Sequence, residues 1–193
     1  MKIGDLAATL RELPASAGET VLVGIDGFSG AGKTELAVAL SDDEEIASQS
    51  IEAFYLGWTG LAAGVERARS GLVEPLQRGE TPRWRGWDWD RGEDGPEQEH
   101  PVTTRILLLE GCGAAATALR HSQALTIWVH AEEEERERRL RARSDWAEYA
   151  PYRERWQRQE RALAMREGLP RAADAVVEWR SEGSLAMRTS PHR

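Results

Sequence analysis

The sequence predicts an α/β fold in which a doubly wound parallel sheet is flanked by helices. Short apolar runs rich in β-branched residues, typical of buried parallel strands, recur along the chain. Segments of helical character separate these runs, and strands that alternate with helices build a parallel sheet. A glycine-rich segment joins the first run directly to a helix. With 193 residues, 40% of them hydrophobic, the chain has the size of one such domain.

The expected elements follow from the spacing of apolar residues and from Pro and Gly breakers. Strands are expected at residues 20–26, 46–51, 105–111, 125–130 and 173–179. Helices are expected at residues 3–13, 34–40, 61–78, 132–143 and 152–167. We expect the last of these helices to pack on the sheet and assign it no chemistry. Residues 79–101, rich in Gly, Pro, Trp and charge, are expected to form a long loop or insertion. Residues 1–180 should form a single domain, and residues 181–193 a disordered tail.

Composition excludes several classes of partner. The formal net charge of −8 argues against sequence-independent binding to nucleic acid, which needs a basic surface. Cys112 is the only cysteine, so no internal disulfide can form, as is usual in the reducing cytoplasm. Residues 1–6 lack the apolar core of a signal peptide, and no apolar run approaches the roughly 18 residues of a membrane span. We therefore expect a cytoplasmic protein without membrane or nucleic-acid partners; the oligomeric state stays open, a homo-oligomer included.

The segment from Gly27 to Thr34 matches the phosphate-binding pattern G-x-x-x-x-G-K-S/T between a strand and a helix. Glycines let the backbone approach phosphate oxygens, and the helix N-terminus favours negative charge. Lys33 is expected to reach the β- and γ-phosphates of a nucleotide, and the Thr34 hydroxyl to bind Mg²⁺. Lys2 and Lys33 are the only lysines among 25 basic residues, and the rest are arginine. Lysine at position 33 therefore indicates a place that needs a compact ammonium group rather than a planar guanidinium. The expected nucleotide-binding residues are Gly27, Ser29, Gly30, Ala31, Gly32, Lys33 and Thr34.

Several classes of phosphate-loop protein are excluded by missing motifs. A GTPase needs Asn-Lys-x-Asp, but no lysine follows Lys33, and no Asp is followed three positions later by Gly. The Ser-Gly-Gly signature of transporter ATPases is also missing, and a ring ATPase needs a longer chain. A small-molecule kinase that uses ATP and Mg²⁺ fits the motif and the length.

Further segments carry a resemblance to the uridine kinase-like branch of P-loop kinases. The matching segments are Ile25–Thr34, Glu52–Tyr55, Trp87–Trp89, Leu108–Gly111 and the arginine-rich stretch Arg138–Asp145. The second stands where the family usually has Asp-Asp/Ser-Phe-Tyr, and the third where it has Tyr-Asp-Phe. The resemblance implies the P-loop NTPase fold with a small arginine-rich lid at residues 132–145.

The resemblance also implies catalytic roles. Glu52 takes the position of the family's base beside the acceptor hydroxyl, with Ala53 where a second acid is often found. Arg139 and Arg143, with Arg141 as a further candidate, would close with the lid over ATP and neutralise charge on the transferring phosphoryl group, together with Lys33. Two alternatives stay open: Glu52 as a solvated residue, and the arginines as a salt-bridged helix face.

Metal and acceptor sites follow in the same way. Glu110 ends the most apolar strand, where ligands bind in open α/β sheets, and is expected to act on Mg²⁺ through bound water. Its alternative role is an ion pair with a nearby arginine. The resemblance implies that Tyr55, Trp87 and Asp88 hold the acceptor, the Asp on a sugar hydroxyl. The tryptophans could equally anchor the insertion to the core.

The resulting functional hypothesis is transfer of the γ-phosphoryl group of ATP to a small metabolite. The resemblance favours a nucleoside or nucleotide; pantothenate, a sugar or another vitamin precursor stays open. Two other classes compete. An ATP-binding regulator would bind nucleotide without turnover, and a partner-dependent ATPase would hydrolyse ATP without an acceptor.

Overall fold

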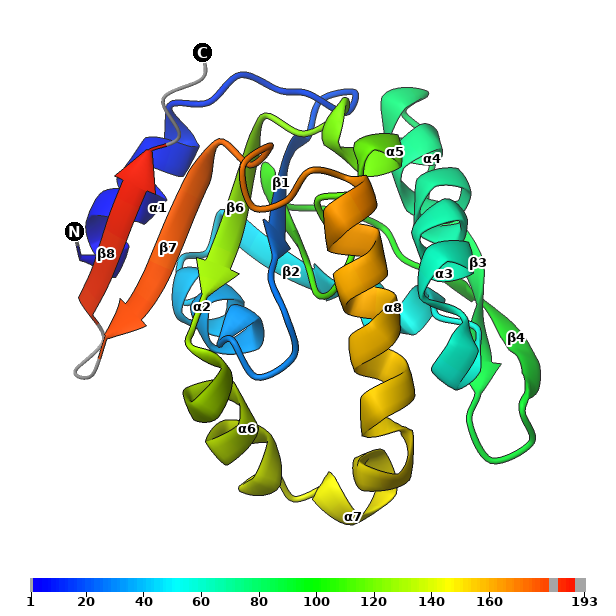
Figure 1. Ribbon diagram of the computed structural model, residues 1–193. Helices are drawn as coiled ribbons and strands as arrows, with labels where there is room; N and C mark the ends of the chain where they lie inside the picture. The colour runs from blue at the N-terminus through cyan, green and yellow to red at the C-terminus, as the bar shows by residue number, and fades with distance from the viewer. Residues whose placement is uncertain (1, 181–183, 190–193) are drawn as a thin grey trace.

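The computed structural model describes residues 2–180 and 184–189, and its centre is a six-stranded sheet of order β2-β5-β1-β6-β7-β8 (Figure 1). Its strands are β1 (Val21–Asp26), β2 (Ile46–Ser50), β5 (Ile106–Glu110), β6 (Leu125–His130), β7 (Ala175–Arg180) and β8 (Ser184–Thr189). Neighbouring strands from β2 to β7 pair in parallel, whereas β8 pairs antiparallel with β7. The predicted α/β fold with a mostly parallel sheet is therefore confirmed.

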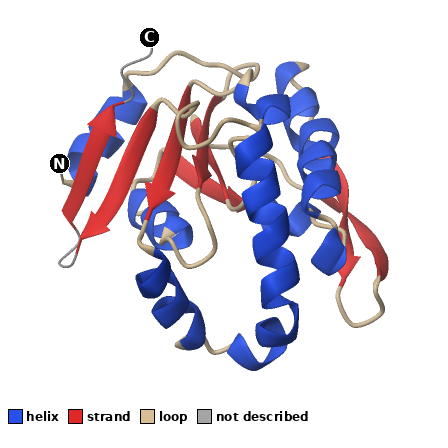
Figure 2. Cartoon of the chain, viewed as in Figure 1, coloured by secondary structure: helices blue, strands red, loops and turns tan. Residues whose placement is uncertain are grey.

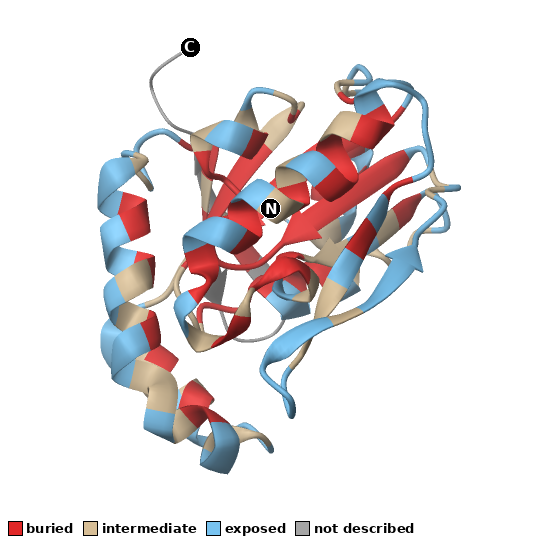
Figure 3. Cartoon of the chain, turned by 90° about the vertical axis from the view of Figure 1, so that its right-hand side faces the viewer, coloured by how far each residue is buried: buried red, intermediate tan, exposed pale blue. Residues whose placement is uncertain are grey.

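Helices cover both faces of the sheet (Figure 2). They are α1 (Ile3–Arg11), α2 (Lys33–Leu40), α3 (Leu61–Ala68), α4 (Glu74–Gln77), α5 (Thr117–Arg120), α6 (Glu133–Arg141), α7 (Trp146–Tyr149) and α8 (Arg153–Arg166). Alternate residues of β5 point to opposite faces. Ile106 and Leu108 join the core beneath α1 and α2, and Leu107 and Leu109 join the core beneath α3, α5 and α8. Burial on both sides explains why the strands read as continuous apolar runs (Figure 3). None of the helices in the described residues has the length and apolar character of a membrane span.

Residues 79–101 were predicted to be a long loop or insertion, and the loop is wrong, because most of the segment forms an antiparallel hairpin of β3 (Arg83–Asp88) and β4 (Glu93–Glu99). The hairpin lies outside the main sheet, and most of its residues are exposed or half-buried. Its strands therefore lack the apolar alternation that marks a strand in a sequence. Trp84 is the exception: it is buried, 4.3 Å from the ring centre of Phe54.

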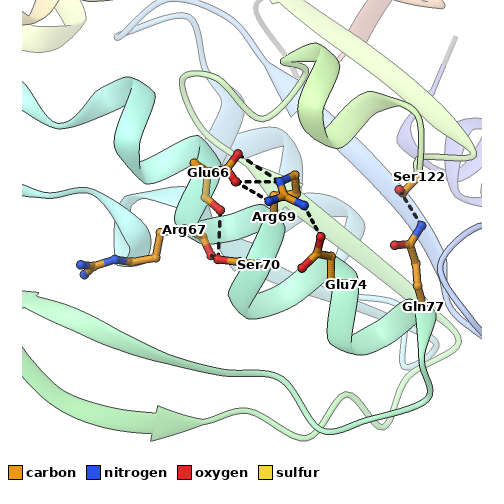
Figure 4. A network of polar contacts seen from close by, with 7 residues as sticks. All are labelled: Glu66, Arg67, Arg69, Ser70, Glu74, Gln77 and Ser122. Atoms are coloured by element: carbon orange, nitrogen blue, oxygen red, sulfur yellow. Dashed lines mark hydrogen bonds and ion pairs between the residues drawn. The ribbon is translucent and has the colours of Figure 1, made fainter.

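The hairpin is anchored to one helical segment, which runs through α3, a π-helical turn at Arg69–Val73 and α4. A Cβ atom on Gly71 would lie 2.9 Å from the Cβ of Trp84, so glycine permits this close approach. Arg67 donates to the backbone oxygen of Arg85 at 2.9 Å and to Asp94 at 2.7 Å. Along the same segment the guanidinium of Arg69 bonds both Glu66 and Glu74, bracing the turn (Figure 4).

The prediction of a disordered tail is wrong for Ser184–Thr189, which form the edge strand β8. Leu185 is buried in the core beneath α1 and α2, which gives the strand an apolar anchor. Residues 181–183 and 190–193 of the predicted tail lie outside the described residues. The predicted lid, residues 132–145, consists of α6 and the turn that leads to α7. In Figure 1, α6 and α7 extend beyond the carboxyl edge of the sheet, and α7 leads to the lower end of α8.

Candidate functional site

The glycine-rich loop that matches the phosphate-binding pattern, here called the phosphate-binding loop, follows β1 and is enclosed by β6 and α6. A Cβ atom on Gly27 would lie 2.4 Å from the backbone oxygen of Val129, at a φ of +149°. A Cβ atom on Gly30 would lie 2.6 Å from the backbone oxygen of Arg136, at a φ of +79°. Both positions therefore require glycine. Gly32 is the N-cap of α2, so the loop ends at a helix N-terminus, a favourable place for phosphate.

Asp26, at the end of β1, joins the loop to the segment after β5. Its carboxylate accepts hydrogen bonds from the backbone N–H groups of Gly27 at 2.7 Å, Gly113 at 3.0 Å and Ala115 at 2.9 Å. Burial raises the pKa of Asp26 to about 6, although these hydrogen bonds and the charge of Lys33 lower it. The residue fixes the start of the loop from inside the protein.

Lys33 is buried below the loop, and its ammonium donates to the backbone oxygen of Phe28 at 3.2 Å and to the sulfur of Cys112 at 3.5 Å. Burial by itself would lower the pKa of Lys33, but four neighbouring groups outweigh burial and raise it. These are the Cys112 sulfur and the carboxylates of Glu160, Glu110 and Asp26. The ammonium is thus held in its charged form, as phosphate binding requires.

Glu160, on α8, contacts the loop at Ser29. Its Oε1 accepts from the backbone N–H of Ser29 at 3.0 Å, from the Ser29 hydroxyl, and from the Cys112 thiol at 3.0 Å. The side chain is buried. Sequence analysis assigned α8 no chemistry, although one signal was available: Glu160 lies on the same helical stripe as Trp156 and Leu163, the buried face of α8.

Thr34 and Glu110, the predicted metal ligands, lie together. The Thr34 hydroxyl donates to Oε2 of Glu110 at 3.3 Å. Burial raises the pKa of Glu110, opposed by the charge of Lys33 and by hydrogen bonds from Ser50 and Thr34. Within the described residues no group of three or more His, Cys, Asp or Glu side chains could hold a metal ion. A hydroxyl with one carboxylate suits Mg²⁺, which keeps several waters and takes further oxygens from phosphate.

A cavity of about 550 Å³, here called the loop cavity, opens over these groups. Its lining includes Ser29, Gly30, Gly32, Lys33, Thr34, Ser50, Glu52, Glu110, Arg139 and Arg143. Arg139 bonds Glu135 at 2.7 Å and the backbone oxygen of Ala31 at 3.2 Å, which links α6 to the loop. Arg143 pairs with Asp145. The structure thus brings Lys33, Glu52 and the two arginines to one cavity; their catalytic roles stay predictions.

A second cavity of about 590 Å³, here called the aromatic cavity, adjoins the first. Ser29, Glu52 and Arg143 line both. Its other lining residues are Tyr55, Trp58, Trp89, Asp90, Asp145, Ala147, Glu148, Tyr149, Pro151, Tyr152 and Trp156. Glu52 lies just after β2, in the 3₁₀ helix Ile51–Phe54. The Ser50 hydroxyl caps the first turn of this helix by accepting a hydrogen bond from the backbone N–H of Glu52. Its carboxylate is exposed where the two cavities meet.

Of the three residues predicted to hold the acceptor, Tyr55 lines the aromatic cavity, whereas Trp87 and Asp88 do not. Tyr55 lines the aromatic cavity, with its hydroxyl bonded to the backbone oxygen of Cys112 at 2.8 Å. Asp88 instead closes the hairpin turn, accepting from the N–H groups of Asp90 at 3.1 Å and Arg91 at 2.9 Å. Trp87 lies against Gly57. The lining of the aromatic cavity contains the next pair along the chain, Trp89 and Asp90, in place of Trp87 and Asp88.

Most of the aromatic lining was missed by sequence analysis. Trp58 lies at its centre, stacked on Tyr152 with a centroid distance of 4.6 Å and an interplanar angle of 6°. Trp89, Tyr149 and Trp156 also lie within ring contact of Trp58. These residues come from the turn before α3, the hairpin tip and the α7–α8 segment, so no local motif could have joined them.

The comparisons agree with this architecture. No protein-family model and no curated protein matches the chain. Among solved structures, a possible uridine kinase from Bacillus stearothermophilus is 16% identical, with a TM-score of 0.65 over 90% of this chain and 96% of its own. A candidate fructose transport system kinase from Silicibacter sp. TM1040 is 21% identical, with a TM-score of 0.56 over 93% of this chain and all of its own. The chain therefore shares the fold of these two proteins, as its resemblance to the uridine kinase-like branch predicted.

Proposed function

We propose that the protein is a phosphotransferase that moves the γ-phosphoryl group of ATP to a hydroxyl group of a small metabolite. One observation carries this proposal: the loop cavity and the aromatic cavity meet at Ser29, Glu52 and Arg143. A kinase needs a donor site and an acceptor site that join where the phosphoryl group passes. A nucleotide sensor or a simple ATPase has no need for the second cavity.

On the donor side, the loop amides and the N-terminus of α2 would hold the β- and γ-phosphates. Lys33 lies below the loop with its charge maintained by the acids around it. Thr34 and Glu110 would hold Mg²⁺ directly or through water, and the ion would supply charge neutralisation across the phosphates.

On the acceptor side, Glu52 would accept the proton of the acceptor hydroxyl. The hydroxyl oxygen forms a bond to the γ-phosphorus while the bond from that phosphorus to the bridging oxygen breaks, and ADP leaves. Arg139 and Arg143 line the donor side and are suited to neutralise the transferring group.

The charge of the aromatic cavity limits which classes of acceptor molecule it can bind favourably. Arg143 is the one basic residue in its lining among the described residues, and it is already paired with Asp145. Four carboxylates share that lining. A nucleotide acceptor would bring its own phosphate to this acidic surface, so the charge disfavours it. A nucleoside, which the resemblance favours, carries no such charge.

The test is ADP release from Mg-ATP with a panel of nucleosides, nucleotides, vitamins, sugars and amino alcohols. We expect at least one acceptor to raise ADP release above the acceptor-free rate. We expect Lys33→Ala to weaken ATP binding by about tenfold or more, the loss of a charged phosphate contact. Lys2→Ala is the matched control, since it removes the other lysine of the chain. ATP binding without any acceptor-dependent turnover would contradict the proposal.

A further inference from the structure

Aromatic rings form much of the wall of the aromatic cavity. Six of its lining residues are aromatic: Tyr55, Tyr149 and Trp156 are buried, and Trp58, Trp89 and Tyr152 are more accessible. Trp58 lies 4.9 Å from the ring centre of Trp89 and 4.6 Å from that of Tyr152. The faces of such rings are electron-rich and attract cations, tryptophan most strongly.

The same cavity carries an excess of negative charge. Its lining includes the carboxylates of Glu52, Asp90, Asp145 and Glu148. Asp145 is neutralised by Arg143, with an N–O distance of 2.6 Å. In the part of the chain that the structure describes, the other three form no salt bridge; Glu52 interacts with the charge of Arg143, whereas the charges of Asp90 and Glu148 are available to a ligand.

Within the described residues, no side-chain cation forms a cation–π contact with the rings of the aromatic cavity. The cation–π contacts found there join Arg136 to Phe28 and Arg141 to Trp146, and none of these four residues lines the aromatic cavity. A neutral planar ligand would stack on the rings but would leave Asp90 and Glu148 beside it without a counter-charge. A cationic ligand would both lie favourably against the ring faces and pair with these carboxylates.

We propose that the acceptor is a hydroxyl-bearing organic cation, such as an alcohol with a quaternary ammonium or pyridinium group. This inference rests on the proposed function, because it names the substrate class of the same site. The hydroxyl lies at the shared end of the two cavities, beside Glu52. The cationic group lies among Trp58, Trp89, Asp90 and Glu148, which line the aromatic cavity and not the loop cavity.

Binding is tested by calorimetric titration of the whole protein without nucleotide, using probe pairs that differ in charge and little in shape. One pair is choline and 3,3-dimethyl-1-butanol; the other is 1-(2-hydroxyethyl)pyridinium and 2-phenylethanol. We expect the cation of at least one pair to bind about tenfold more tightly than its neutral partner. Equal affinity within both pairs, including no detectable binding by any probe, overturns the inference.

Variants locate the site. Asp90→Asn and Glu148→Gln should each weaken cation binding several-fold and leave the neutral probes unchanged. Glu97→Gln is the matched control, because this exposed carboxylate on β4 lies outside the cavity and its loss changes the net charge equally. If Glu97→Gln weakens cation binding as much as the cavity variants do, the attraction is a general surface effect and the inference fails.

Phosphoryl transfer separates this inference from the proposed function. Higher ADP release with a cation than with its neutral partner, abolished by Lys33→Ala, supports both. A neutral nucleoside as the best acceptor overturns the cationic acceptor while leaving the kinase proposal intact. Cation binding without transfer to any acceptor overturns both, since the cation is then not an acceptor.

Discussion

The carboxylate of Glu160 accepts a hydrogen bond from the backbone N–H of Ser29 at 3.0 Å, although the two residues lie 131 positions apart. The same oxygen also accepts a hydrogen bond from the thiol of Cys112, at 3.0 Å. The phosphate-binding loop is thus fixed from α8 by a buried carboxylate. We expect Glu160→Ala to lower the free energy of unfolding by about 2 to 4 kcal/mol, because buried donors lose a charged acceptor.

Chemical unfolding measures this effect. Glu154→Ala on the same helix is the control, because Glu154 is exposed and its contact to Arg158 is as long as 4.0 Å. We expect its effect to stay within about 0.5 kcal/mol of zero. Equal stability of the two variants would show that the Glu160 contact does not hold the loop.

Glu52 is expected to act on the acceptor and not on ATP. Glu52→Gln should lower kcat by about 10²- to 10⁴-fold, the usual contribution of a general base, and leave ATP affinity within about threefold. Glu35→Gln removes the same charge from the loop cavity without touching the aromatic cavity and should keep most activity. Steady-state kinetics with the acceptor found in the panel decide the matter; an active Glu52→Gln enzyme would remove Glu52 from the role of base.

Asp26 makes stability depend on pH. Burial raises its pKa from 3.8 to about 6, so the folded protein binds this proton more tightly than the unfolded chain does. Its contribution, on the order of 3 kcal/mol, is fully present below about pH 4 and is lost as the pH rises through about 6. Carbon-13 NMR titration of the Asp26 carboxyl should give a midpoint near 6. A midpoint close to the ordinary value would show that its three N–H donors outweigh burial.

Substitutions of Trp87 and Trp89, two neighbouring tryptophans of the hairpin, test which residues hold the acceptor. Trp89 lines the aromatic cavity and is 45% exposed, so Trp89→Leu should fold normally and lower kcat/KM for the acceptor by about tenfold. Trp87 lies outside that lining, and Trp87→Leu should change kcat/KM by less than about threefold. A larger loss in Trp87→Leu would restore Trp87 and Asp88, the pair that the family resemblance implies.

The sequence predicts the parts of this molecule whose signals are local. The five parallel strands of the described residues were predicted, and β1, β5 and β6 gave the clearest signal because strands buried on both faces are continuous apolar runs. The phosphate-binding loop is one contiguous motif, and Glu110 ends one of those runs. The hairpin was missed because its exposed strands contain Gly, Pro and charge. β8 was missed because it consists of a few residues held by pairing with β7.

The second half of the site could not be predicted in this way. Trp58, Trp89 and Tyr152 lie far apart in sequence and meet only when the hairpin and the α7–α8 segment fold beside the 3₁₀ turn that carries Trp58. Glu160 lies in a helix rich in charge, and its place on the helical stripe of Trp156 and Leu163 indicates burial but not the contact with Ser29. Such contacts depend on topology, which short patterns do not encode.

Transfer of labelled phosphate tests the central claim most directly. The protein would be incubated with Mg²⁺, a mixture of hydroxyl-bearing metabolites, and ATP carrying oxygen-18 on its γ-phosphoryl group, and the products would be read by mass spectrometry. The two-cavity site predicts one metabolite that gains a phosphoryl group with the labelled oxygens, and no such product with Lys33→Ala. Label found only in free phosphate, at the same rate with and without metabolites, would contradict the account and make the protein an ATPase.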